Sequence, residues 1–379
     1  MLGLVSLFMD TSSELVHSLL PIFMAAVLGT SMVTIGLIEG VAEAAAAISK
    51  VFSGALSDYF AKRKFLVVFG YALSAITKPV FPLAATIDWV FGARFVDRIG
   101  KGIRGAPRDA LIADMVTPQQ RGTAYGLRQS LDSAGAFLGP LLAVLFMSWL
   151  AGDIKAVLWI AVIPAILSVL VLIFAVHEPE TDKSSSDSNS HLKLTDAKRL
   201  SLKFWLVVAF GAVFTLARFS EAFLILRAQD LGMEVSLVPV IMIVMNIGYA
   251  LFAYPSGMAA DRFSSRKLLV VGLVVLIMAD LILALATTPW TALFGAALWG
   301  LHMALTQGLL AKLVADTASA DLRGSAFGIF NLVSGLALLL ASVVAGILWS
   351  EFGASATFIA GAVFAAITAS GLLLYRRKV

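Results

Sequence analysis

The chain has 379 residues, of which 60% are hydrophobic and 14% charged, and its mean hydropathy is +0.93. Soluble domains contain roughly 45 to 50% apolar residues, so this composition excludes an ordinary soluble domain and predicts an integral membrane protein. The net charge of +4 does not indicate nucleic-acid binding, because the basic residues lie in short segments beside apolar runs. Cysteine is absent, which excludes disulfides and thiolate metal sites.

Twelve predominantly apolar runs each reach the ~20 residues that one membrane-spanning helix requires. The first run exceeds the apolar region of a signal peptide and carries Asp10, Glu14 and His17, so we expect it to be the first span rather than a cleaved signal. The predicted fold is therefore an all-α membrane protein. The expected spans cover residues 2–28, 33–57, 65–86, 88–115, 122–150, 155–176, 204–229, 235–258, 267–287, 289–315, 322–348 and 354–375.

The loops between these spans alternate in charge. Lysine and arginine are concentrated on one side, as at residues 62–64 and 376–378, whereas the other side offers only Lys155. The positive-inside rule then predicts that both termini and the middle segment are cytoplasmic.

Residues 177–203 form a long polar break that contains Pro179 and the run Ser184-Ser185-Ser186. This composition predicts a flexible cytoplasmic linker between an amino-terminal bundle of residues 1–176 and a carboxy-terminal bundle of residues 204–379. Its later part, from about His191, could instead lie as a short helix on the membrane surface.

One loop pattern occurs twice. Gly54, Asp58 and Arg63 recur as Gly257, Asp261 and Arg266, and the offset of the two aspartates is 203 residues (261 minus 58). A repeat of this length indicates a tandem duplication of a membrane-embedded half, the arrangement on which secondary transporters are built. Glycine lets two helices approach closely, and the aspartate can pair with a cation when one conformation forms, so we expect these loops to act in gating.

The two loops match a motif of the major facilitator superfamily, and the resemblance to that family covers essentially the whole length of the chain. The resemblance implies two six-helix bundles, each of 3+3 inverted repeats, around a central cavity. It also assigns the gating-loop positions to Gly54, Asp58, Arg63, Gly257, Asp261 and Arg266.

The fourth span carries an unusual number of charges on one face. Its residues 98–106 resemble a motif of proton-coupled members of this family, with Lys101 where glutamine is usual. A charge at mid-bilayer costs ~2.5 to 3.5 kcal/mol, so this face is expected to meet protein or water. The aligned second-half positions lack the charges, which favours a functional role over an internal salt-bridge network. The group comprises Arg94, Asp97, Arg98, Lys101, Arg104, Arg108 and Asp109.

Carboxylates on spans 1 and 2 are candidate partners for this basic face. A carboxylate buried beside a movable guanidinium can gain and lose a proton, which would couple transport to a proton gradient. Glu14 with Arg98 is the first choice, and Glu39 or Glu43 is the reserve.

Span 5 contains Gly126, Gly135 and Gly139-Pro140, and so resembles the antiporter motif of exporters in this family. Ala143-Val144 replaces its final glycine pair. The match favours export by antiport, while ordinary glycine-rich helix packing would explain the same residues.

Polar residues at helical spacing complete the predicted binding surface, which is more charged in the first half than in the second. Such a surface suits an anionic or zwitterionic solute. The predicted substrate-binding residues are Asp10, His17, Arg94, Lys101, Arg104, Arg128, Asp132, Arg218, Glu221, Asn246, Tyr249, His302 and Gln307.

The sequence therefore predicts a secondary active transporter, expected to be monomeric, in a bacterial cytoplasmic membrane. No phosphate-binding loop, nucleotide fingerprint or zinc spacing is present, so we expect no enzyme activity, no metal and no cofactor beyond the proton gradient. The leading hypothesis is proton-coupled export, and the alternative is proton-coupled import of an anionic nutrient or metal chelate such as a siderophore. A membrane sensor would require an added soluble domain, for which residues 177–203 are too short.

Overall fold

The computed structural model describes residues 1–60, 63–178, 199–319 and 322–374, and these residues are almost entirely helical, with no strand among them. The helices, including the short π-helix η1 and 3₁₀ helix η2, are α1 (Leu2–Ile22), η1 (Phe23–Val27), α2 (Met32–Phe60), α3 (Arg63–Thr77), α4 (Val80–Leu83), α5 (Ile87–Met115), η2 (Pro118–Gln120), α6 (Arg121–Trp149), α7 (Ile154–Ile160), α8 (Val162–Ala175), α9 (Leu202–Leu216), α10 (Ala222–Asp230), α11 (Val240–Arg262), α12 (Ser265–Leu285), α13 (Pro289–Thr317), α14 (Arg323–Phe352) and α15 (Ala354–Leu374).

Every expected span coincides with a helix or with two consecutive helices, so the all-α fold class is confirmed and the arrangement is consistent with twelve spans. Eight helical stretches of the described chain are long and apolar enough to cross a membrane by composition alone. Helix α5 is not among them, because its charged face lowers its hydropathy. That face can be accommodated only where it meets protein or water.

Three spans that the sequence predicted as single helices are interrupted. The breaks fall at residues 78–79, at Ala161 and at residues 217–221. Pro79 follows Lys78 and ends α3, since proline cannot continue the backbone hydrogen bonding of a helix. Interrupted helices inside a membrane are tolerated where the freed backbone groups are buried in protein or line a wet space.

Several helix starts are fixed by short polar side chains. Asp153 accepts a hydrogen bond from the backbone N–H of Ala156, and Ser201 accepts one from Phe204. Gly353, with a φ of +83°, provides the sharp turn between α14 and α15 that a residue with a side chain rarely adopts. The turn at Gly353 places α14 beside α15.

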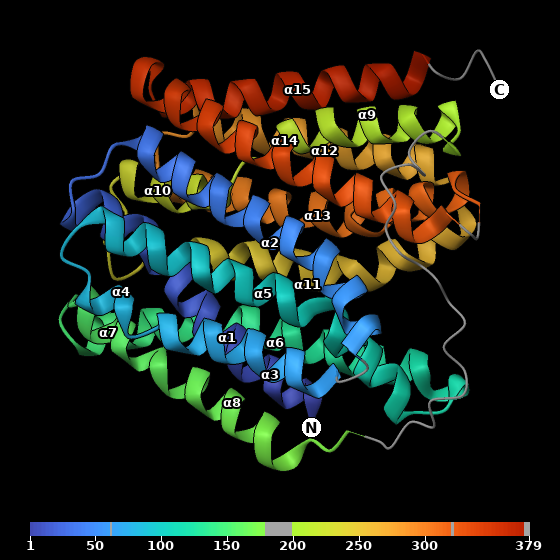
Figure 1. Ribbon diagram of the computed structural model, residues 1–379. Helices are drawn as coiled ribbons and strands as arrows, with labels where there is room; N and C mark the ends of the chain where they lie inside the picture. Colours follow the sequence, from blue (N-terminus) through green and yellow to red (C-terminus); the bar gives the residue numbers. More distant parts are fainter. Residues whose placement is uncertain (61–62, 179–198, 320–321, 375–379) are drawn as a thin grey trace.

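Helices of each half pack mainly on one another, as Figure 1 shows for α1, α3 and α8 at one edge and for α9, α14 and α15 at the opposite edge. The halves meet along α2 with α14, α6 with α11, and α1 with α10. The division into bundles of residues 1–176 and 204–379 remains a prediction, and most of the expected linker, residues 179–198, lies outside the described residues.

Candidate functional site

A cavity of about 560 Å³ lies between the two halves, next to a second space of about 420 Å³. Both spaces are lined by Glu14, Glu43 and Lys101, so they form one continuous central site. The larger space also reaches Lys50 on α2 and Gln129 on α6, in the half of α2 that ends at Phe60 and the half of α6 that begins at Arg121. It therefore extends toward the end of the molecule where α2 ends and α6 begins, at the right of Figure 1.

The opposite end of the site is closed by direct helix contact. Gly40 of α2 lies so close to α14 that a Cβ placed on it would be 2.9 Å from the carbonyl oxygen of Leu339. Gly36 meets the carbonyl oxygen of Ser342 even more closely, and Gly346 meets that of Met32. Glycine is required here because any side chain would push α2 and α14 apart.

The charged face of α5 divides between the cavity and the protein interior. Lys101, Arg104 and Arg108 line the larger space and Arg98 lines the smaller one, whereas Arg94 and Asp97 line neither and are 1% and 3% exposed. The later turns of this face therefore line the central cavity. Arg94, predicted to bind substrate, is instead sealed inside the first half.

Arg98 forms an ion pair with Glu43, in which Nη2 lies 3.2 Å from Oε1. The first-choice pair of Glu14 with Arg98 is not formed in this structure, because Glu14 is directed to its own helix neighbour His17, with Oε2 and Nδ1 3.5 Å apart. Glu43, named as a reserve, thus takes the place expected for Glu14. All four side chains line the smaller space.

Glu39, the other reserve, is sealed rather than cavity-facing. Arg94 donates to it in a bidentate manner, from Nε to Oε1 at 3.1 Å and from Nη2 to Oε2 at 2.7 Å. Ser220, from the break between α9 and α10, donates to Oε2 at 3.5 Å. This carboxylate therefore joins α2 and α5 to the second half close to the glycine contacts that close the site.

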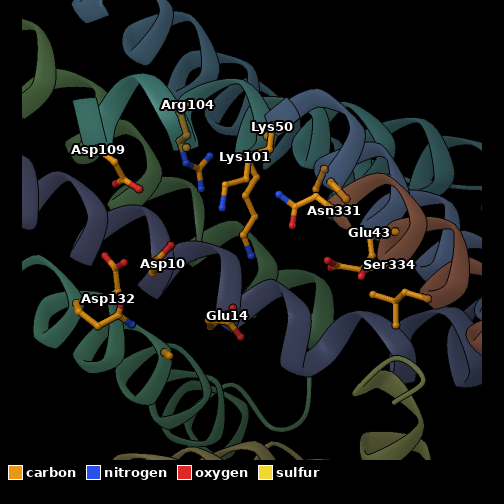
Figure 2. A pocket seen from close by; sticks show the side chains of 18 of the residues that line it. Asp10, Glu14, Glu43, Lys50, Lys101, Arg104, Asp109, Asp132, Asn331 and Ser334 are labelled. Atoms are coloured by element: carbon orange, nitrogen blue, oxygen red, sulfur yellow. The ribbon is translucent and has the colours of Figure 1, made fainter. Parts of the chain in front are cut away.

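Four cationic side chains of the site, Lys50, Lys101, Arg104 and Arg218, have no carboxylate partner among the described residues. Lys101 extends from α5 into the space beside Asp10 and Glu14, as Figure 2 shows, and Arg218 faces the smaller space with its guanidinium 5.7 Å from the ring of Phe214. Asp10 and Glu221 likewise line the site without an ion pair in the part of the chain that the structure describes. The unpaired charges of the site among the described residues are thus of both signs, with four cations and two carboxylates.

Other charged groups of the first half neutralise one another at the cavity edge. Arg128 pairs with Asp132 at 2.9 Å and lies 3.7 Å from Asp109, while Arg104 donates to Ser74 at 2.6 Å. Arg128 itself does not line the cavity, although Asp132 does. The internal salt-bridge network kept as an alternative therefore exists alongside the cavity-facing groups.

The second half contributes mostly uncharged polar groups, as the sequence predicted. Asn246 lines both spaces, and its Nδ2 donates to the carbonyl oxygen of Ala136 at 3.0 Å across the two halves. Tyr249 lines the larger space and Trp299 the smaller. His302 is fully buried, contacts the carbonyl oxygen of Gly272 and does not reach the site. The side chain of Gln307 is outside the described part.

Two motif glycines of span 5, which corresponds to α6, pack on α1. A Cβ on Gly139 would lie 2.7 Å from the carbonyl oxygen of Thr11, and one on Gly135 would lie 2.8 Å from that of Leu7. Gly126 has nothing within 4 Å. The motif thus fixes α6 against the helix that carries Asp10 and Glu14.

The two copies of the repeated loop differ in their contacts. Arg63 forms an ion pair with Asp114 at the end of α5 and donates to the carbonyl oxygen of Ala110 at 3.2 Å. Arg266 instead donates to the carbonyl oxygen of Leu373 at 2.8 Å. Gly257 is exposed. The side chains of Asp58 and Asp261, and the surroundings of Gly54, lie outside the described residues, so the gating role of these loops stays a prediction.

Sequence reasoning missed several groups of the site and its surroundings. Lys78 donates to Asp97 at 2.9 Å and to Ser13 at 3.0 Å deep in the first half, and it follows an apolar stretch that gave no sign of a charge partner. Asn331 and Ser334 of α14 line the larger space. Both lie in a span whose composition is almost wholly apolar, and a polar stripe at helical spacing was the only available signal.

The described residues contain no cluster of three or more His, Asp or Glu side chains that could hold a metal ion. The site is therefore built from ion pairs, amides and hydroxyl groups around a polar cavity between two halves. That architecture defines the class of membrane transporters in which a solute passes between two helical bundles.

Comparisons with known proteins agree with this class. The Major Facilitator Superfamily model matches residues 2–243 and 207–379. An uncharacterized MFS-type transporter of Methanocaldococcus jannaschii is 35% identical over 383 residues, covering 99% of this chain and 93% of the relative. The multidrug resistance protein MdtH of an Enterobacter species is 33% identical over 100 residues, covering 26% of this chain and 24% of that protein.

Solved structures share the fold at low sequence identity. The nucleoside transporter NupG has a TM-score of 0.81 at 17% identity, covering 100% of this chain and 98% of that one. A D-xylose-proton symporter has a TM-score of 0.72 at 16% identity, covering 98% of this chain and 95% of that one. The chain belongs to the major facilitator superfamily. It is a multi-pass membrane protein and a secondary transporter, a class that carries small molecules.

Proposed function

We propose that this transporter exports a small polar organic solute in exchange for protons, by alternating access of the central cavity. The observation that carries the proposal is the Arg98–Glu43 ion pair at the cavity wall. Protonation of Glu43 would remove its negative charge and release Arg98. A solute that binds Arg98 would break the same ion pair, so the solute and the proton act on the same two side chains. We propose Glu14 and Glu39 as further proton-coupling residues in the same network of side chains.

The presence of unpaired groups of both signs in one site supports a zwitterionic solute among the classes expected from the sequence. Lys101 and Arg218 offer unpaired cations to an anionic group, and Asp10 and Glu221 offer carboxylates to a positively charged one. A bulky lipophilic cation would leave the unpaired cations of the site without partners. The resulting unpaired charge in a confined space is costly.

Alternating access is supported by the contrast between the two ends of the cavity. The end near the N-terminus is hollowed, and the other end is closed by glycine contacts between α2 and α14. Topology by the positive-inside rule makes the hollowed end cytoplasmic. We infer that both termini are cytoplasmic, that the membrane is a cytoplasmic membrane and that the protein acts as a monomer without a cofactor.

Export is favoured by the antiporter-like span 5, whose Gly135 and Gly139 pack on α1. Import of an anionic nutrient or metal chelate is the second candidate, and the unpaired Lys101 and Arg218 favour it. The two functions differ in the direction of solute relative to protons.

Reconstitution into liposomes with an imposed pH gradient tests the proposal. Pools of zwitterionic, anionic and cationic solutes would be screened for movement that depends on the gradient. Export by antiport predicts that a zwitterionic solute moves against the direction of the protons. Movement of an anion together with the protons would establish the second candidate, and transport of every pool independent of the gradient would refute proton coupling.

A further inference from the structure

A separate, smaller cavity of about 120 Å³ lies inside the second half, among α9, α12, α13 and α15. Its walls are apolar side chains such as Phe210, Leu273 and Leu313, with Thr368 as the uncharged polar exception. Polar solutes of the central site do not fit such a lining, because their groups would lose their hydrogen bonds to water. The chemistry of the wall instead matches a hydrocarbon chain.

Two cations lie at this cavity. Lys203 and Arg266 line it, and no carboxylate forms an ion pair with either one among the described side chains. Arg266 is held in place by its hydrogen bond to the carbonyl oxygen of Leu373, at the end of α15. An apolar slot with two positively charged groups at one end is complementary to a molecule with an anionic head and an apolar tail.

The helix directions strengthen the attraction for an anion. Lys203 and Arg266 both lie in the first turn of their helices, α9 and α12, and neither first turn contains an acidic residue. The N-terminal end of a helix carries a partial positive charge, so basic residues placed there oppose the dipole unless an anion is present. Both helices begin at the end of the molecule that carries the repeated loops, at the level expected for lipid headgroups.

The duplicated position in the first half shows that topology alone does not explain Arg266. Arg63 lies 203 residues earlier (266 minus 63) and forms an ion pair with Asp114 within the protein. Positive-inside topology requires a cation at both places. It does not explain why Arg266 has no carboxylate partner among the described side chains, or why an apolar cavity lies beside it.

We propose that this cavity is a binding site for an anionic phospholipid, with an acyl chain between α9, α12, α13 and α15 and the headgroup phosphate between Lys203 and Arg266. Basic pockets between membrane helices at the cytoplasmic face have the chemistry that holds anionic headgroups. The site is separate from the central cavity and stands whether or not the proposed substrate class is right.

Native mass spectrometry of the detergent-purified full chain tests this site by titration with phosphatidylglycerol and with phosphatidylcholine of the same chain length. The wild type is expected to bind phosphatidylglycerol more tightly, and Lys203→Gln/Arg266→Gln should weaken that binding by about tenfold or more. The matched control, Lys64→Gln/Arg121→Gln, removes two cations from the same end of the first half and should leave it unchanged.

Two further measurements separate the lipid from other occupants. Leu313→Phe narrows the cavity without changing charge and should also weaken phosphatidylglycerol binding, while glycerol phosphate, which has no acyl chain, should not compete. Equal binding of both lipids, equal loss in the control, full binding by Leu313→Phe, or competition by glycerol phosphate would each overturn the proposal. Size-exclusion profiles identify any variant that fails to fold.

Discussion

Arg98 on α5 is paired with Glu43 on α2 at 3.2 Å, while Glu14 on α1 is turned toward His17. The two carboxylates line the same space and are within the field of the same guanidinium, yet only one of them holds it in this conformation. Exchange of Arg98 between the two carboxylates would link helices α1, α2 and α5 to the protonation state of the cavity. The proposed coupling therefore involves the carboxylates of Glu14 and Glu43 and the guanidinium of Arg98.

Replacing Glu43 by Gln removes the group that would be protonated but preserves its size. We expect Glu43→Gln to lower the rate of transport driven by a pH gradient by at least about tenfold. Proton transfer by a positioned side chain typically raises a rate by ~10² or more where it is used. Solute counterflow, which needs no net proton movement, should continue. Loss of counterflow together with gradient-driven transport would show that Glu43 serves binding or folding instead of coupling.

Lys101 is predicted to hold the anionic group of the solute. Lys101→Gln should weaken solute binding by about tenfold, since a hydrogen bond to a charged partner contributes roughly 1.5 to 3 kcal/mol. Lys101→Arg should retain most of the affinity because the charge remains. Isothermal titration with a solute identified in the liposome screen measures the effect. The control is Lys312→Gln, an exposed lysine on α13 outside the cavity lining, and an equal loss there would make the effect non-specific.

The Glu39–Arg94 pair is predicted to stabilise the first half. Both side chains are almost completely buried, so Glu39→Gln leaves the guanidinium with an incomplete partner. Removing one member of a buried pair costs about 3 to 5 kcal/mol. Thermal unfolding in detergent, followed by size-exclusion, should show a clearly lowered midpoint. The double variant Glu39→Gln/Arg94→Gln should recover part of the loss, and no change in the single variant would show that the pair is energetically neutral.

The glycines of span 5 offer an internal comparison. Gly139→Ala places a methyl group against the backbone of α1 and is expected to destabilise by about 1 to 3 kcal/mol through overpacking. Gly126→Ala, in the same helix with open space around it, should have no such cost. The same thermal measurement decides between them, and equal behaviour of the two variants would mean that α1 and α6 are less closely packed than described.

The sequence predicted the all-helical fold well because apolar run length is a direct physical requirement of the bilayer. It also placed Lys101, Asp10 and Asn246 at the cavity, since each is a polar group in an otherwise apolar span. The helix break at residues 217–221 was not predicted, because this segment contains neither glycine nor proline, the residues that most often mark a break. The sequence also could not predict which carboxylate pairs with which cation.

Pairing depends on which helix faces lie together, and spacing along one helix cannot give this. Glu14 and Glu43 lie on different helices at similar depth, so either could have met Arg98. Arg94 shares a face with Arg98 by helical periodicity but lies one turn closer to the closed end, where α2 covers it. A charged stripe therefore predicts that some of its members reach water without telling which.

The central claim is that the later turns of the α5 charged face line a water-filled cavity open at one end. The chain contains no cysteine, so a single introduced thiol reports on its own position. We predict that Lys101→Cys in membrane vesicles reacts with a membrane-impermeant thiol reagent from the side of the N-terminus, whereas Val90→Cys, at a fully buried position of α5, does not. A Lys101→Cys variant that is folded but unreactive from both sides, and reactive only after denaturation, would contradict the account.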